Sequence, residues 1–212
     1  MSKKFYAPIL GSLVLGSLFC PLEASTECPR VCPQDIPRPD IEFKAGYFFF
    51  TSSPMRKVFN QGGIDLQLCG VYPLCSNLGL YAAVEYMGKY GHTLGAHEKT
   101  SIWEIPLSLG LQPIVGLNDD NTIRYYFTIG PKYFFAQVTN HSSGLPHRLS
   151  SNNIGGFANT GFMYDFCDYL SLDVFGEYSY VKLRFHSSKK ATKGHTVQAG
   201  GLTFGLGLAY LF

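Results

Sequence analysis

The sequence of 212 residues has few charged side chains and no long hydrophobic run after its N-terminal region. Asp, Glu, Lys and Arg make up only 15% of the chain, less than a soluble domain usually carries, and the formal net charge is +2. The longest later uncharged stretch, 66–84, is interrupted by Pro73 and by the polar segment 75–77. These interruptions favour two strands and a turn, and they exclude a membrane-spanning helix in this stretch.

The N-terminal region has the order of features found in secretory signal peptides. Lys3 and Lys4 precede a charge-free segment, 5–22, and a small-residue site follows at Ala24. The apolar core is shorter than the roughly 20 residues of a spanning helix, so cleavage is favoured over an uncut anchor. Lipid modification at Cys20 is the weaker alternative. We expect a signal peptide at 1–24 and a periplasmic leader, rich in proline and cysteine, at 25–40.

The C-terminal segment, 202–212, alternates large apolar residues with small ones. Such alternation describes a strand with one face in hydrocarbon and the other in a crowded interior. A soluble sandwich could show the same pattern, but it would rarely lack charge on both faces. The large residues are Leu202, Phe204, Leu206, Leu208, Tyr210 and Phe212, and the small ones are Thr203, Gly205, Gly207 and Ala209.

This segment resembles the terminal strand of bacterial outer-membrane barrels, in which a final aromatic residue follows alternating apolar residues. The resemblance implies recognition by the barrel-assembly machinery and localisation in a bacterial outer membrane. Seven earlier segments alternate in the same way, and each reaches the length of about 9 to 11 residues that a tilted membrane strand needs. They are 41–51, 63–72, 78–88, 101–112, 122–138, 154–166 and 170–181.

Eight strands are an even number, as closure of a bacterial outer-membrane barrel requires. We therefore expect an all-β fold, an eight-stranded antiparallel transmembrane β-barrel with meander topology over residues 41–212. It resembles the transmembrane domain of OmpA and the OmpX class. Pro106 and Pro131 each remove a ladder donor, which predicts bulges or later strand starts there. The expected long outer loops are 52–62, 89–100, 139–153 and 182–197, and the expected periplasmic turns are 73–77, 113–121 and 167–169.

The inward positions of these strands collect charged side chains. They could line an ion path or fill a polar core. An eight-stranded barrel is just wide enough for its own side chains, and buried charges need partners, so a plugged core is favoured over a narrow channel. The acids are Glu42, Asp65, Glu85, Glu104, Asp165, Asp173 and Glu177, and the cations are Lys44, Arg124 and Lys132.

The expected outer loops contain all six histidines of the chain and many cations. These residues predict an outer rim that is cationic at neutral pH and becomes more positive as the pH falls toward 6, where histidines titrate. Anionic glycans and lipopolysaccharide are the expected partners; a nucleic acid is not expected. Ordinary solvated loops, or a metal site of converging histidines, are the alternatives, and we expect neither metal nor cofactor. The residues are His92, His97, His141, His147, His186, His195, Arg56, Lys57, Lys89, Lys99, Arg148, Lys189, Lys190 and Lys193.

Lys182 and Arg184 continue the outward face of strand 170–181 beyond its tyrosines. Tyrosines on a lipid face mark the membrane interface, so the next outward positions should lie among lipopolysaccharide phosphates. The predicted polyanion and lipopolysaccharide contacts are therefore Lys182, Arg184, Lys189, Lys190, Lys193, His186 and His195.

Five cysteines follow the expected cleavage site, in the leader or at periplasmic strand ends. The periplasm is oxidising, so we expect disulfides there, including links to other envelope proteins, and an odd number leaves one thiol free or paired between chains. Metal binding by the first two is weaker because no second ligand pair accompanies them. This cysteine usage is similar to the disulfide-linked envelopes of chlamydia-like bacteria, without a matched motif. The candidates are Cys28, Cys32, Cys69, Cys75 and Cys167.

One segment has a faint enzymatic resemblance. His186-Ser187-Ser188 is similar to the His-x-Ser pair of eight-stranded lipid A deacylases, but Gln198 stands in the region where those enzymes carry an orienting acid. Without that carboxylate the triad fails. We therefore expect a structural or surface-interaction protein, not an enzyme; a lipid A-modifying enzyme and a narrow channel are the alternatives.

Overall fold

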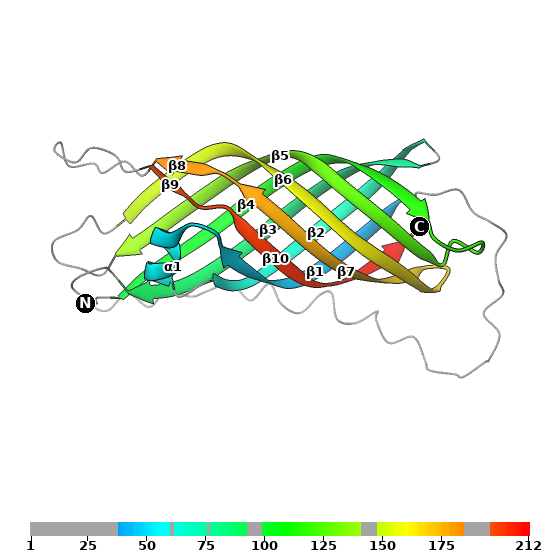
Figure 1. Ribbon diagram of the computed structural model, residues 1–212, viewed down its shortest axis with the longest axis horizontal. Coiled ribbons are helices and arrows are strands. Elements are labelled where there is room, and N and C mark those ends of the chain that lie inside the picture. The colour runs from blue at the N-terminus through cyan, green and yellow to red at the C-terminus, as the bar shows by residue number, and fades with distance from the viewer. Residues whose placement is uncertain (1–37, 60–61, 76, 93–98, 141–147, 185–195) are drawn as a thin grey trace, which may run out of the picture. The chain divides into compact units, whose positions relative to one another are not determined.

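The described residues of the chain form a closed antiparallel barrel of eight strands. The computed structural model describes residues 38–59, 62–75, 77–92, 99–140, 148–184 and 196–212. Neighbouring strands follow the order β1-β10-β7-β6-β5-β4-β3-β2, so each strand pairs with the next and β10 closes on β1. The predicted eight-stranded meander is therefore confirmed. The strands, which run obliquely in Figure 1, are β1 (Asp40–Phe50), β2 (Gly62–Cys75), β3 (Leu78–His92), β4 (Lys99–Gly116), β5 (Ile123–Asn140), β6 (Arg148–Cys167), β7 (Leu170–Tyr180) and β10 (Gly201–Leu211).

Three short elements accompany the barrel. A helix, α1 (Ser53–Phe59), follows β1, and β8 (Lys182–Arg184) pairs with β9 (Thr196–Gln198) in a separate ladder. Figure 1 shows α1, β8 and β9 at one end of the barrel, which we call the loop end, and the β4–β5 and β6–β7 turns at the other, which we call the turn end. Among the described residues, no helix is long and apolar enough to cross a membrane.

Alternation along each strand separates an apolar outer wall from a polar interior. On β1, Phe43 is 53% exposed, whereas Glu42 and Lys44 on either side of it are buried. The paired strand β10 repeats this, with Leu206 and Leu208 exposed and Ala209 buried. A barrel that buries charges in its interior and exposes large apolar side chains on its outer wall is stable only when lipid surrounds that wall. We call this exposed apolar wall the lipid-facing belt.

The prediction of bulges at Pro106 and Pro131 is wrong. The β3–β4 pairing skips Glu85 and Tyr86, which stand opposite Pro106 and Ile105, but the register is the same before and after the gap. The β4–β5 pairing has a similar gap beside Pro131 and again no shift. A missing N–H therefore removes hydrogen bonds without moving the strand, because the alternation of faces fixes the register. The register shifts lie instead at the turn end, between Pro73 and Cys75 and between Asp165 and Cys167.

Several strands extend further than expected. β3 continues to His92, which pairs with Lys99 at the start of β4, and β6 begins at Arg148, paired with Thr139. β4 likewise runs to Gly116 at the turn end. The additions to β3 and β6 are mostly polar, since the ladder continues in water beyond the belt, where alternation of apolar residues no longer marks a strand.

Candidate functional site

The half of the interior nearer the turn end contains a buried ion cluster around Lys44. Its Nζ lies 3.1 Å from a carboxylate oxygen of Glu42 and 2.7 Å from one of Asp173. The hydroxyl of Tyr126 lies 2.9 Å from Nζ and donates to Asp173 at 2.7 Å. Nearby, Arg124 is 2.7 Å from Asp165. The positive charges in this half are therefore paired, as buried charges must be.

A second ion cluster surrounds Lys132, closer to the loop end. Its Nζ lies 2.5 Å from Glu85 and also pairs with Glu177. Ser108 donates a hydrogen bond to Glu85 at 2.9 Å. Between these groups and Glu104, the remaining cavity is about 10 Å³, roughly the room of a single water. The described interior is thus a plugged polar core, which was the favoured expectation.

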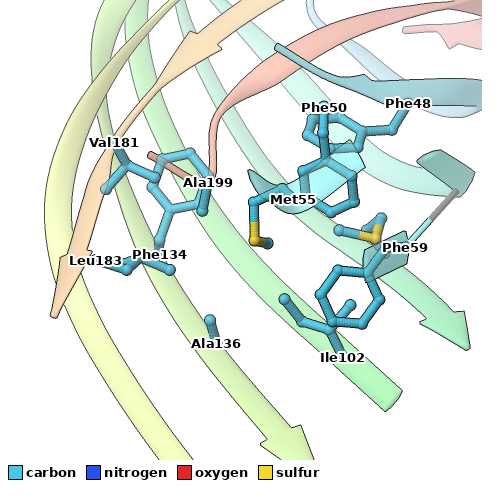
Figure 2. Close-up of a cluster of buried hydrophobic side chains, with 11 residues drawn as sticks. Phe48, Phe50, Met55, Phe59, Ile102, Phe134, Ala136, Val181, Leu183 and Ala199 are labelled. Atoms are coloured by element: carbon cyan, nitrogen blue, oxygen red, sulfur yellow. The ribbon is translucent and has the colours of Figure 1, made fainter. Parts of the chain in front are cut away.

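The loop end of the interior is apolar and closed by α1. Figure 2 shows Met55 and Phe59 of the helix pointing toward Phe48 and Phe50 of β1 and toward Ile102 of β4. Met55 and Phe59 are 6% and 3% exposed. The sequence pattern predicts an outer loop over 52–62, and α1 shows that this prediction is wrong for 53–59. The available signal was Pro54 in the first helical turn, followed by apolar residues at 55, 58 and 59, one face of a helix.

Three of the candidate cysteines lie within the described residues, and all three are free thiols. Cys75 is exposed and Cys167 is half-buried, each at a turn-end register shift. Cys69 does not lie at a strand end: it is buried in the lumen, where Tyr81 donates a hydrogen bond to its sulfur at 3.3 Å. It cannot reach another chain from the folded barrel. Cys28 and Cys32 lie outside the described residues.

The cationic candidates at the loop end are only partly within the described chain. Lys182 and Arg184 are exposed on β8, as the extended outward face predicts, and His92 is exposed at the end of β3. Lys189, Lys190, Lys193, His186 and His195 lie outside the described residues, as do His97, His141 and His147. No group of three His, Cys, Asp or Glu residues within the described part is placed to hold a metal ion.

A polar groove of about 490 Å³ lies between the outer end of β6 and the β8–β9 ladder. Lys182 and Arg184 line it, and neither forms an ion pair with any residue in the described ranges. Ser151 donates to the carbonyl of Arg184 at 2.8 Å, and Asn153 donates to that of Lys182 at 2.7 Å, so side chains attach β8 to β6. The other described lining residues are Ser150, Asn152 and Thr196, so no acid is found among the lining residues that the structure describes. Sequence reasoning identified both cations but not the polar residues.

The possible deacylase motif has no acidic partner at the position considered. His186, Ser187 and Ser188 lie outside the described residues. Gln198, on β9, is half-buried and donates its amide to Thr51 at 3.3 Å. Gln198 therefore connects the end of β1 to β9 and has a structural role.

No protein-family model and no curated protein sequence matches this chain. Solved structures do match it. Outer membrane protein OprG from Pseudomonas aeruginosa is 13% identical over 82% of this chain and 96% of that one, with a TM-score of 0.60. Neisserial surface protein A is 17% identical over 82% and 97%, with a TM-score of 0.53. Ail, the attachment invasion locus protein of Yersinia pestis, solved in complex with the heparin analogue sucrose octasulfate, is 14% identical over 82% and 98%, with a TM-score of 0.54.

At these identities the matches establish the fold. The expected likeness to small eight-stranded outer-membrane barrels is confirmed, whereas the likeness to chlamydia-like envelopes stays a prediction. The lipid-facing belt independently requires a membrane around the wall. By its closure, its belt and its structural neighbours, this chain is a small eight-stranded β-barrel of the bacterial outer-membrane type.

Proposed function

We propose that this chain is a structural and surface-interaction protein of the outer membrane, whose loop end faces outward and binds anionic glycans and lipopolysaccharide. In this proposal residues 1–24 are removed as a signal peptide, residues 25–40 form a periplasmic leader, and residues 41–212 form the barrel. The protein has no catalytic role. Binding at the outer rim is its activity.

The filled interior argues for an external function. A narrow channel would need a continuous path, yet ion pairs of Lys44 and Lys132 fill the middle of the interior and α1 packs into the loop end. A lipid A deacylase would need an orienting carboxylate, and Gln198 is an amide bonded to Thr51. Both alternatives are therefore less favoured than surface binding.

The main observation behind this proposal is the pair of exposed cations, Lys182 and Arg184, in a groove whose described lining residues include no acid. Cations without acidic partners attract anions, and a guanidinium can bind a phosphate or sulfate through two parallel hydrogen bonds. The structure of Ail with a heparin analogue shows that a barrel of this fold can hold a sulfated sugar. Lys189, Lys190, Lys193, His186 and His195 would add charge around the same rim.

Heparin retention tests the proposal. Retention of the purified protein should increase between about pH 7.5 and about pH 5.5, the range in which histidine side chains generally gain a proton. Added salt should weaken it. Replacing Lys189, Lys190 and Lys193 by Ser should reduce it, whereas Arg38→Ser at the turn end should not. Equal retention at both pH values and in both variants would leave the rim without polyanion binding.

The cysteines form a separate part of the proposal. We infer that Cys75 and Cys167, with Cys28 and Cys32 of the leader, link the barrel to other envelope proteins on the periplasmic side. Cys75 and Cys167 carry free thiols at the turn end, and an oxidising compartment favours their pairing. Forming each disulfide removes two electrons and two protons, which a periplasmic protein disulfide would accept.

A further inference from the structure

We propose that the outer wall just above the lipid-facing belt carries a binding site for the phosphorylated sugar headgroup of a membrane glycolipid, built from β4, β5, β6 and β8. This inference rests on the proposed anion binding at the loop end. It adds a sugar-binding half, assigns the residues that form it, and identifies the ligand as a lipid of the surrounding membrane.

Two hollows adjoin each other on this wall. The groove lined by Lys182 and Arg184 is the first. The second, of about 290 Å³, lies on the other side of the outer end of β6 and is lined by Trp103, Phe135, Ala136 and Gln137. Both share the segment 150–152. A ligand lying across this segment would contact two cations on one side and two aromatic rings on the other.

Strand pairing fixes the order of these side chains. Trp103 pairs with Gln137, which pairs with Ser150, so the three form one row across the outer wall. The next row toward the belt contains Phe135 paired with Asn152. Because the ladder fixes the backbone position of each residue, these side chains leave adjacent strands at fixed points and in a fixed order.

The aromatic half suits a sugar ring. Sugars present apolar C–H faces and a rim of hydroxyls, so an aromatic side chain covers the face while amides and hydroxyls bind the rim. Asn152 donates its amide nitrogen to Tyr133 at 2.8 Å, which orients its oxygen as an acceptor. Gln137 and Ser150 provide further donors and acceptors beside it.

The cationic half suits a phosphate attached to that sugar. Arg184 and Lys182 stand on alternate positions of β8 with the buried Leu183 between them, so both project outward. The bonds from Ser151 and Asn153 hold the backbone of β8 at these two residues. A guanidinium and an ammonium on alternate positions of one strand can together bind a phosphate, with Arg supplying the planar pair of donors.

Position relative to the membrane favours a lipid over a soluble glycan. Directly below Phe135 and Asn152, the next outward row contains Leu107, Tyr133 and Ile154. Leu107 is 45% and Ile154 66% exposed, as residues of the lipid-facing belt are. A lipid whose headgroup lies in the site would place its acyl chains against the belt, so one molecule would contact both the polar site and the apolar wall.

Trp103 makes the site measurable, because it is the single tryptophan of the chain. The full-length protein, purified and placed in phosphatidylcholine nanodiscs, is titrated with lipid A, a phosphorylated glucosamine lipid, or with phosphatidylglycerol at equal total charge. We expect saturable change in Trp103 fluorescence with lipid A, and an affinity about tenfold higher than for phosphatidylglycerol. Lys182→Ala/Arg184→Ala should weaken lipid A binding about tenfold or more. The control Arg38→Ser, which removes a cation at the turn end, far from the groove, should bind normally.

A second variant separates the sugar site from simple charge attraction. Asn152→Ala/Gln137→Ala should remove the preference for lipid A while leaving phosphatidylglycerol binding unchanged, with heat-modifiable gel migration verifying the folded barrel. Equal affinity of the wild type for the two lipids would overturn the sugar site but not the proposed anion binding. Unchanged binding in Lys182→Ala/Arg184→Ala would overturn both at this groove. A response to a soluble sulfated glycan but not to lipid A would show that the ligand is not a lipid.

Discussion

The ammonium of Lys44 on β1 lies 2.7 Å from the carboxylate of Asp173 on β7, although β10 separates these strands in the barrel. Tyr126 on β5 joins the same pair through its hydroxyl. The polar interior therefore connects strands that share no ladder. Since a buried ion that loses its partner is costly, these contacts stabilise the closed barrel only while each member is present.

Replacing Lys44 by Met should lower the free energy of unfolding by about 3 to 5 kcal/mol, because it leaves Glu42 and Asp173 buried without their cation. Urea titration in lipid vesicles, followed by Trp103 fluorescence, measures this. The double variant Lys44→Met/Asp173→Asn should lose less than the sum of the single changes. Lys57→Met, at an exposed position, is the matched control; similar stabilities for Lys44→Met and Lys57→Met would contradict the role of the cluster.

Phe59→Ala should loosen α1 from the barrel. Phe59 is 3% exposed, and its ring packs 5.9 Å from that of Phe50, centroid to centroid. Truncating a buried phenylalanine costs about 3 to 5 kcal/mol, more than a helix of seven residues gains from its own hydrogen bonds. Amide hydrogen exchange should therefore accelerate in α1. Lys57→Ala, on the exposed face of α1, should leave this exchange unchanged.

The three described cysteines should differ in reactivity. In the folded barrel, Cys75 and Cys167 should react with a bulky maleimide, whereas Cys69 should react only after unfolding, because it is buried against Tyr81. The cross-linking of these cysteines has its own test. Non-reducing gels of envelopes should show oligomers that disappear on reduction and in the variant Cys75→Ser/Cys167→Ser. If that variant keeps its oligomers, the leader cysteines form the links. If the wild type runs as a monomer without reductant, the links do not exist.

The sequence predicts the wall of the barrel well and its contents less well. Alternation identifies Phe43 as outward and Lys44 as inward, because lipid and lumen impose opposite preferences on neighbouring residues. It cannot predict that Lys44 meets Asp173, since barrel closure decides which inward side chains face each other. The groove was missed for another reason: the segment 150–153 is polar on both faces, so no alternation marks it as strand.

The hydrogen bonds between β3 and β4 should open more often than those between β1 and β10. The β1–β10 ladder pairs every residue from Asp40 to Phe50. The β3–β4 ladder instead skips Glu85, opposite Pro106, and the neighbouring Tyr86. Proline donates no hydrogen bond, and in lipid no water replaces the lost one, so the neighbouring amides are held less tightly. Exchange at Glu85 and Tyr86 should be faster than in the middle of β1. Pro106→Ala restores a donor without changing the register, so it should slow exchange at these two residues and leave β1 unaffected. Equal exchange in both ladders, or an Ala variant with unchanged rates, would mean that this gap in the ladder has no effect on local stability.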